Sequence, residues 1–350
     1  MSLEFRRRCC CCRSVTCLED LANEILFEIF DYLDGCDILH AFSHLNNHFE
    51  QFLHHSSYLY RIYRFSTREH TFQSYCRRYL LSHRYQILSL HLFDQVLINS
   101  FFQLSSPDLS FSRLQSLVLI AIKPSQLLVF LHQSTNDPRL IRLTIRLIGP
   151  TNNLDHLYGR IFQISTLKSL KFSIAMEEKQ FILPTNFHSP ISSLERFNLD
   201  HDCSIRQLDH LLSYTPHLQH LICRRLLDAR SVLPNRLENL RSISIKDWDV
   251  SFDHFEIFVK QLHCSKLEAL SFVNRSNDLT YLDADLWQKL IDQSIPRLHR
   301  LNFQFVKRFP SEDFFPMIQR QIRQFWIEHR WIFQLEINFR EMIYSFHPYR

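Results

Sequence analysis

The chain has 350 residues, of which 45% are hydrophobic, and its formal charge at pH 7 is +4. This length is ample for a buried core, and the nearly balanced charge argues against a general nucleic-acid binder, which is more often basic throughout. Only three glycines occur, so neither a phosphate-binding loop nor a dinucleotide fingerprint can be written. The composition therefore argues against catalysis through a nucleotide, and we expect no cofactor.

Residues 1–17 hold four arginines against one glutamate, together with five cysteines. No apolar segment follows the basic residues as in a signal peptide, and no 18-residue apolar stretch predicts a transmembrane helix. Cys9 and Cys12 form a C-x-x-C pair without a second pair or a histidine at zinc-finger spacing. We expect a disordered tail, with S-acylation of its cysteines as the alternative. The cysteines are expected as thiols in the cytoplasm or the nucleus.

Residues 18–62 show apolar positions at helical spacing. A first helix carries a continuous stripe that runs from Leu21 to Leu33. It is expected to end at Asp34-Gly35, because glycine is favoured just past a helix C-terminus. Asp37 is expected to cap a second helix, and a third helix is expected to begin at Phe49. Three helices in about 45 residues make a marginal core, so this module is expected to lean on the rest of the chain or on a partner.

The stretch from Leu18 to Phe49 resembles an F-box. The residues that carry the resemblance are Glu24-Ile25-Leu26, Ile29-Phe30, Tyr32-Leu33 and Asp37-Ile38-Leu39, which match the family pattern in type and spacing. The chain departs from it at Ala22, where the family usually has a proline that fixes φ at the helix entry. The resemblance implies that the module docks on a Skp-type adaptor, which joins it to a cullin–RING ubiquitin ligase. The packing and adaptor-facing residues that it implies are Leu21, Ile25, Leu26, Ile29, Phe30, Leu33, Ile38 and Leu39.

After an expected helical linker over residues 63–84, residues 85–306 repeat a short apolar run of the form leucine, two residues, leucine, one residue, leucine. The copies follow one another at steps of 22 to 31 residues. Steps of this size are typical of a stacked solenoid, which usually serves as a binding surface. Eight copies begin at Leu114, Leu140, Leu167, Leu194, Leu218, Leu240, Leu267 and Leu298, and an earlier one reads Tyr85-Leu88-Leu90.

Helix-like segments separate these runs, at residues 125–133, 154–163, 205–213, 253–263 and 283–293. Short strands that alternate with helices predict an α/β fold, a curved horseshoe with the strands on its concave side. The repeats resemble leucine-rich repeats, except that positions such as Ile122, Trp248 and Arg275 replace the usual asparagine or cysteine after the third leucine. We therefore expect an irregular leucine-rich-repeat-like solenoid. A doubly wound sheet is the alternative, although it favours longer strands and glycine-rich turns.

The residues beside and between the last two anchors of each run are expected on the concave face. Seven of the charged residues at these positions are basic, and Asp200 is the single acidic one. They form either an ordinary solvated face or a positive surface for an acidic or phosphorylated protein segment. The seven candidate substrate-binding residues are Arg142, Arg146, Lys171, Arg196, Arg224, Lys246 and Arg300.

Residues 307–350 are expected to cap the last coil, with a helix that begins at Ser311 and with bulk from Phe325, Trp326, Trp331 and Phe333. Cys203, Cys223 and Cys264 lie in or near expected strands, where cysteine behaves as a small buried hydrophobe.

Twenty histidines occur, but none of the usual hydrolase, kinase or metalloprotease signatures is present. We therefore expect a non-catalytic subunit that holds a protein substrate near a ubiquitin-conjugating enzyme. One alternative is a scaffold without ligase function, in which residues 18–49 only cap the repeats. The other is a hydrolase, which would need a polar triad in a concave pocket.

Overall fold

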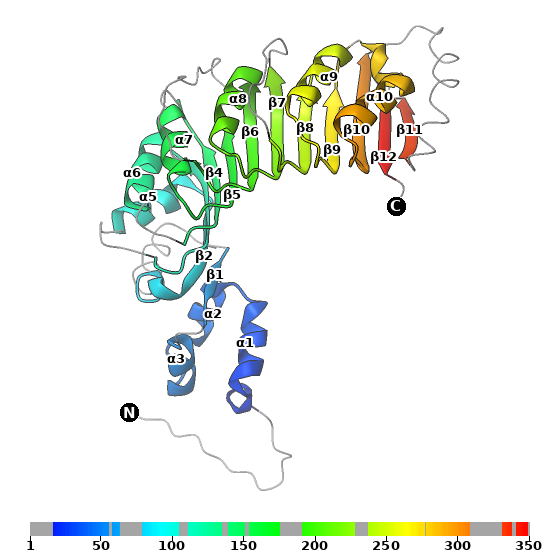
Figure 1. The fold of residues 1–350 in the computed structure, drawn as a ribbon. Coiled ribbons are helices and arrows are strands. Elements are labelled where there is room, and N and C mark those ends of the chain that lie inside the picture. Colours follow the sequence, from blue (N-terminus) through cyan, green and yellow to red (C-terminus); the bar gives the residue numbers. More distant parts are fainter. Residues whose placement is uncertain are drawn as a thin grey trace, which may run out of the picture.

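The computed structural model describes residues 17–55, 58–63, 79–104, 111–134, 139–150, 154–175, 191–227, 237–276, 278–308, 331–337 and 341–348. These residues form a mixed α/β structure with one 12-stranded sheet. A module of three helices lies at the N-terminal end of the sheet (Figure 1).

The strands and helices follow in the order expected for the repeats. The strands are β1 (Tyr60–Ile62), β2 (Ile87–Leu92), β3 (Ser116–Ile122), β4 (Arg142–Leu147), β5 (Ser169–Ile174), β6 (Arg196–Ser204), β7 (His220–Leu227), β8 (Ser242–Trp248), β9 (Ala269–Asn274), β10 (Arg300–Arg308), β11 (Trp331–Ile337) and β12 (Glu341–Pro348). The helices are α1 (Asn23–Asp31), α2 (Gly35–Phe42), α3 (Asn47–Leu53), α5 (Gln95–Leu104), α6 (Pro124–Ser134), α7 (Leu154–Phe162), α8 (Ile205–Ser213), α9 (Phe252–Gln261) and α10 (Ala284–Ser294).

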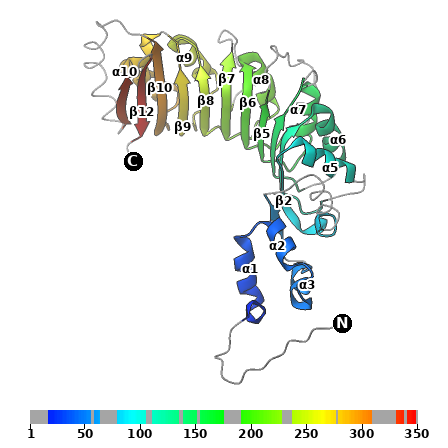
Figure 2. The same ribbon diagram turned by 180° about the vertical axis from the view of Figure 1, so that it is seen from behind.

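Strands β1 to β10 run parallel and pair in sequence order, and β12 and β11 complete the sheet. A doubly wound sheet would change its strand order at a switch point, and this sheet does not. Helices cover one face of the sheet, as Figure 1 shows. The other face carries none of the helices that the structure describes, and it is turned toward the viewer in Figure 2. We call this second face the open face.

Burial explains why the apolar runs form strands. Every anchor of the eight runs from Leu114 to Phe303 is buried, and pairing holds the anchors in register, as where Leu117 lies beside Leu143. Alternate residues of a strand point to opposite faces, so the anchors meet the helices while their neighbours reach the open face. The predicted strand positions are confirmed for these eight repeats.

The first repeat differs from the prediction by two residues. β2 pairs Leu90 with Leu117, so Leu90 is the second anchor of this repeat rather than the third. The predicted first anchor, Tyr85, is 51% exposed, and Ile87 is buried in its place. A shift of two residues keeps the alternation of faces in a strand. The hydrophobic pattern alone therefore cannot distinguish the two positions of this repeat.

The five helices between the later strands begin and end within two residues of the predicted segments. In the N-terminal module, Asp34 rather than Asp37 caps α2, because its Oδ1 accepts a hydrogen bond from the Cys36 N–H at 2.8 Å. Gly35 is buried as the first residue of α2 and does not end the preceding helix. A Cβ there would lie 3.0 Å from Cγ1 of Ile62, so the close approach of α2 to β1 favours glycine.

A repeated backbone pattern joins the coils where the strands begin. The carbonyl oxygen two residues before the second anchor accepts hydrogen bonds from two consecutive N–H groups of the next coil. Gln115, for example, accepts from Ile141 at 2.9 Å and from Arg142 at 2.8 Å. The same arrangement satisfies the backbone in the later coils. Its other acceptors are Ile141, Lys168, Glu195, Gln219, Arg241 and Glu268.

One repeat uses an asparagine at its turn. Asn274 is fully buried, and its Nδ2 donates to the Val250 carbonyl oxygen at 3.1 Å. Its Oδ1 accepts from the Ser276 N–H at 2.9 Å. Asn274 lies one residue before Arg275, the position at which a leucine-rich repeat usually carries asparagine or cysteine. This turn therefore resembles the usual repeat more closely than the spacing predicted.

At the C-terminal end, β12 pairs antiparallel with β10, and β11 pairs antiparallel with β12. Trp331 and Phe333 of the predicted cap lie on β11. Ser311, Phe325 and Trp326 lie outside the described residues. The terminal coil is therefore followed by an edge of two antiparallel strands.

Candidate protein-binding surfaces

The first helix of the N-terminal module exposes an apolar strip. Ile25, Ile29 and Leu33 lie four residues apart, and they are 44%, 36% and 40% exposed. Ile25 and Ile29 lie four residues apart within α1 and therefore share one face of it. Leu33 and Tyr32 follow Asp31, the last residue of α1, and Tyr32 is 91% exposed. We call Ile25, Ile29, Tyr32 and Leu33 the α1 strip. A contiguous exposed apolar surface of this kind is typical of protein-binding sites.

The remaining residues of the predicted adaptor-binding set face the inside of the module. The Phe30 ring meets the Phe52 ring edge-on, with the ring centroids 5.3 Å apart. Adjacent residues such as Ile25 and Leu26 lie at the border between the two faces of α1, so periodicity did not separate them. Leu26, Phe30, Ile38 and Leu39 are buried, and Leu21 is partly buried.

Polar contacts hold the module against the sheet. The Gln86 side chain donates to the carbonyl oxygens of Leu53 and His55, both at 3.0 Å. The Tyr60 hydroxyl donates to the same Leu53 carbonyl at 2.7 Å. The buried core is also continuous from the module through the sheet. The module that carries the α1 strip is therefore packed firmly against the sheet.

All seven basic residues predicted for the concave face are exposed on the strands. Four of them, Arg142, Arg146, Lys171 and Arg196, lie on the adjacent strands β4, β5 and β6. Within the described part of the chain, none of these four forms an ion pair with a carboxylate. We call these four residues the basic strip. No carboxylate in the described part of the chain therefore neutralises these four charges.

The charges are partly neutralised on the strands that follow. Lys246 Nζ lies 3.1 Å from Oδ1 of Asp200, and Arg225 lies 2.7 Å from Asp247 and 3.6 Å from Asp202. The sequence count covered three positions in each strand, so it missed both Asp202 and Asp247. The positive character of the open face is therefore concentrated on β4 to β6. Of the remaining predicted residues, Arg224 and Arg300 lie on β7 and β10.

A buried polar pair lies between β6 and α7. The Tyr158 hydroxyl is 2.6 Å from Nε2 of His201, and Nδ1 of His201 is 2.9 Å from the Asp202 carbonyl oxygen. Burial lowers the pKa of His201 below its usual value, although the Asp202 carbonyl and carboxylate act the other way. The buried and partly exposed residues of β6 alternate without a break from Phe197 to Cys203, so His201 lies on the inward side, although the pairing with β7 shifts between Leu199 and Asp202. The apolar run ends at Leu199, and a histidine two residues later does not continue an apolar pattern, so periodicity did not predict this inward position.

The three predicted buried cysteines are buried, which confirms their assignment. Burial raises the pKa of the Cys223 and Cys264 thiols to about 12. Both are therefore thiols at neutral pH, and the same cause raises the pKa of Cys203. Cys9 and Cys12 lie outside the described residues.

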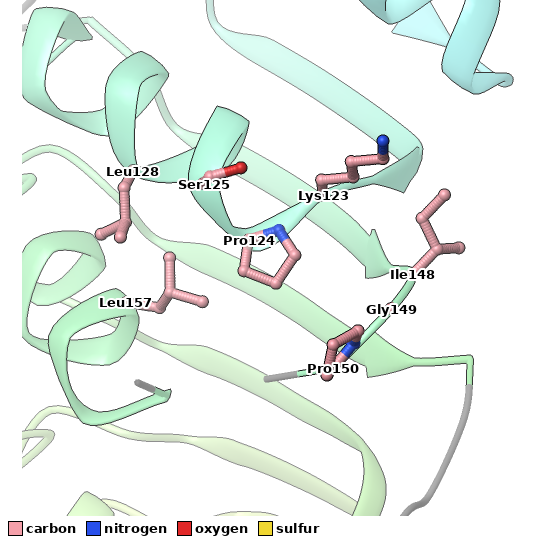
Figure 3. Close-up of a pocket in the computed structure, with 8 residues that line it drawn as sticks. All are labelled: Lys123, Pro124, Ser125, Leu128, Ile148, Gly149, Pro150 and Leu157. Atoms are coloured by element: carbon pink, nitrogen blue, oxygen red, sulfur yellow. The ribbon is translucent and has the colours of Figure 1, made fainter. Parts of the chain in front are cut away.

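A cavity of about 440 Å³ lies beyond β3 and β4, at the starts of α6 and α7. Leu128 of α6 and Leu157 of α7 lie next to one another on one side of it, and Ile148, Gly149 and Pro150 lie on the other (Figure 3). Lys123 and Ser125 supply the polar side chains, and the eight lining residues include no histidine, cysteine or carboxylate.

The described residues contain no group of three or more histidine, cysteine, aspartate or glutamate side chains placed to hold a metal ion. Among the same residues, no helix has both the length and the apolar character needed to span a membrane.

No protein-family model and no curated protein matches the sequence. Among solved structures, the chain is similar to an internalin from Listeria monocytogenes, with 13% identity and a TM-score of 0.24. The similarity covers 67% of this chain and 87% of the internalin chain. The surfaces described above, rather than this weak likeness, are the basis for a functional proposal.

Proposed function

We propose that this protein is the substrate-recognition subunit of an SCF-type E3 ubiquitin ligase. In this proposal the N-terminal module is an F-box that docks on a Skp-type adaptor. The open face of the leucine-rich-repeat-like coils then binds a protein substrate. The observation that carries the proposal is the α1 strip, whose residues are exposed on α1 and directly after it, in the stretch whose sequence resembles an F-box.

Burial of the α1 strip supplies a physical reason for adaptor binding. Ile25, Ile29 and Leu33 still expose about two fifths of their surfaces. Covering the rest contributes roughly 1 kcal/mol for each side chain. Tyr32 adds an aromatic side chain, a residue type enriched at interface hot spots. The strip thus suits a partner that offers an apolar groove.

The basic strip supports the second half of the proposal. It lies on β4 to β6, whereas the α1 strip lies on the helical module below the sheet in Figure 1. Two partners can therefore bind without sharing residues. The protein would then act by proximity, because it holds a substrate near the conjugating enzyme and needs no catalytic group of its own. An acidic or phosphorylated substrate segment would match the positive charges of the basic strip.

The adaptor interaction is tested by pull-down from a cell extract with the full chain as bait. The wild-type protein is expected to capture a Skp-type adaptor together with a cullin, and the double variant Ile25→Asp, Ile29→Asp is expected to lose both. Ile257→Asp is the matched control, because Ile257 on α9 is 48% exposed and lies outside the module. Equal capture by the wild type and the double variant would refute adaptor docking through this strip.

The substrate half is tested by charge reversal of Arg142, Lys171 and Arg196 to glutamate. Capture of proteins other than the adaptor and cullin is expected to fall, while adaptor capture stays unchanged. Unchanged capture of those proteins would exclude the basic strip as the substrate contact.

A scaffold without ligase function is the second candidate. The core runs without a break from α1 into the sheet, so the module also covers the end of the sheet, and Ala22 replaces the proline usual in F-boxes. Wild-type protein that binds no adaptor or cullin in the pull-down would favour this candidate.

A further inference from the structure

The open face has small side chains on two neighbouring strands near its C-terminal end. Ser242 and Ser244 of β8 pair with Ala269 and Ser271 of β9. All four residues alternate with buried anchors and therefore point to the open face. In the same two rows, β4 to β6 combine the small residues Thr144 and Ser169 with the longer Arg142, Lys171, Arg196 and Asn198. β8 and β9 carry small side chains in both rows, so the surface is lower there than on the strands beside them.

Larger side chains flank this low region on both sides. β7 places His220 and Ile222 in the same two rows, and β10 places Arg300 and Asn302 there. Neighbouring strands lie about 4.8 Å apart, so the two walls stand roughly 14 Å apart. That width admits one extended polypeptide with its side chains.

A cavity of about 600 Å³ occupies the region. Ile332 and Gln334 of β11 line it together with Ser242 of β8, although three strands separate β8 from β11 in the sheet. Both sets of side chains can line one cavity only because the sheet curves toward its open face. We call this recess the serine trough. Its polar side chains are Ser242, Ser244, Ser271, Arg300, Asn302 and Gln334.

These six side chains make no hydrogen bond or ion pair with any residue that the structure describes. Hydroxyl and amide groups both donate and accept hydrogen bonds. They can therefore pair with the N–H and C=O groups of a peptide backbone. The guanidinium of Arg300 only donates, and it needs an anion as its partner. Among the residues that line the cavity, Arg300 is the single cation.

The charge of the trough favours a carboxylate over a phosphate. One guanidinium matches one carboxylate through two parallel hydrogen bonds, whereas phosphate recognition generally uses clusters of arginines. The neighbouring His220 adds no second charge at neutral pH. Burial is the main cause that lowers its pKa, and the charges of Arg196, Arg241 and Arg300 lower it further against the opposing effect of Glu268.

We propose that the serine trough binds an extended acidic peptide segment. The segment's backbone pairs with the serine hydroxyls and with the amides of Asn302 and Gln334, and one aspartate or glutamate side chain pairs with Arg300. The identification of this segment as part of a ubiquitination substrate rests on the proposed function. Peptide binding itself is a property of this chain and needs no adaptor.

The test selects a displayed library of short random peptides on the full-length protein. The enriched peptides are expected to contain aspartate or glutamate. For a synthetic peptide from that set, Ser244→Trp and Arg300→Glu are each expected to raise Kd about tenfold or more, measured by fluorescence anisotropy. Arg300→Lys keeps part of the affinity. Ser116→Trp is the matched control, because Ser116 lies on the same face of β3 outside the trough, and its Kd is expected to equal that of the wild type.

Three results would overturn the proposal: no enriched peptide, enriched peptides without an acidic residue, or wild-type affinity in Ser244→Trp. Tighter binding of the same peptide with phosphoserine at the acidic position would overturn the carboxylate assignment. Thermal melts check the fold of each variant, and Ser242→Trp replaces Ser244→Trp if the latter unfolds. Adaptor pull-down on the same preparations tests the ligase proposal separately from the peptide-binding proposal. Peptide binding without adaptor capture refutes the ligase role alone, and adaptor capture without peptide binding refutes the trough alone.

Discussion

The helical module and the open face of the sheet share one continuous core but expose different chemistry. The α1 strip presents aliphatic side chains and a tyrosine, which gain free energy when water is excluded. The open face presents arginines, a lysine and serines, which need charges or hydrogen-bonding partners. The chain therefore has two surfaces whose binding would depend on different forces, apolar burial at the α1 strip and charge and hydrogen bonding at the open face. Salt weakens interactions between exposed charges but not the burial of apolar surface.

The largest expected effect is a difference in unfolding free energy between variants of buried and of exposed apolar residues. Phe272 is 1% exposed, and its ring centroid lies 4.6 Å from that of Phe303. Phe272→Ala is expected to lower the free energy of unfolding by about 3–5 kcal/mol. Ile29→Ala in the α1 strip is expected to change it by less than about 1 kcal/mol. Urea denaturation measures both, and an equal loss would contradict the exposure of the α1 strip.

The buried and exposed asparagines provide a second contrast. Asn274→Ala leaves the Val250 carbonyl and the Ser276 N–H without their side-chain partner, and is expected to cost about 1–3 kcal/mol in unfolding free energy. Asn302→Ala on the open face is expected to leave stability unchanged within about 0.5 kcal/mol. If both variants unfold at the same urea concentration, Asn274 does not support the turn.

Salt is expected to separate the two surfaces. An increase in NaCl from about 0.1 M to 1 M shortens the screening length from about 10 Å to 3 Å. Binding of an acidic peptide to the serine trough is expected to weaken about tenfold, because it depends on the ion pair with the exposed Arg300. Adaptor binding through the α1 strip is expected to change little. Salt-sensitive adaptor binding, measured by titration calorimetry, would contradict the apolar assignment.

The smallest expected effect comes from the buried His201. Its folded-state pKa is lowered, so the unfolded chain takes up a proton as the pH falls below about 6.5 while the folded chain does not. Stability is therefore full above pH 6.5 and is expected to fall by about 1 kcal/mol toward pH 5.5. Tyr158 faces the ring, and Asp200, Asp202 and Arg224 add opposing charge effects.

Thermal melts at the two pH values, with His201→Gln beside the wild type, measure this contribution. The variant is expected to lose less stability on acidification than the wild type. The buried His83 and the partly buried His91, His210 and His220 also have lowered pKa values, and they contribute with the same sign in both proteins. An identical acid response would show that His201 does not contribute.

Much of the fold followed from short-range pattern. The runs that begin at Leu114 predicted eight strands, because one buried face requires apolar residues at alternate positions. The five later helices were predicted to within two residues. The first repeat was displaced by two residues, since that shift preserves the pattern. Asp37 was preferred to Asp34 as a cap because Gly35 resembled a helix end, whereas β1 packs against it.

The sequence predicted which residues belong to the candidate surfaces, but not which of them are exposed together. Ile25, Ile29 and Leu33 were grouped with buried neighbours such as Leu26, because adjacent positions on a helix border both faces. Arg300 was grouped with six other basic residues, although it alone among them lines the serine trough. The trough depends on Gln334 of β11, which no repeat pattern connects with β8.

The amino-acid order alone was enough to establish the repeat, the eight strands β3 to β10, the five later helices and the excess of basic residues beside the anchors. Each of these depends on residues close together in the chain, where burial imposes a short period. The fold was needed to show which apolar residues of α1 stay exposed and which charges are neutralised, as Lys246 is by Asp200, 46 residues away. It was also needed to bring β11 beside the trough. These features depend on the stacking of coils and the curvature of the sheet, which bring together side chains that no local periodicity relates.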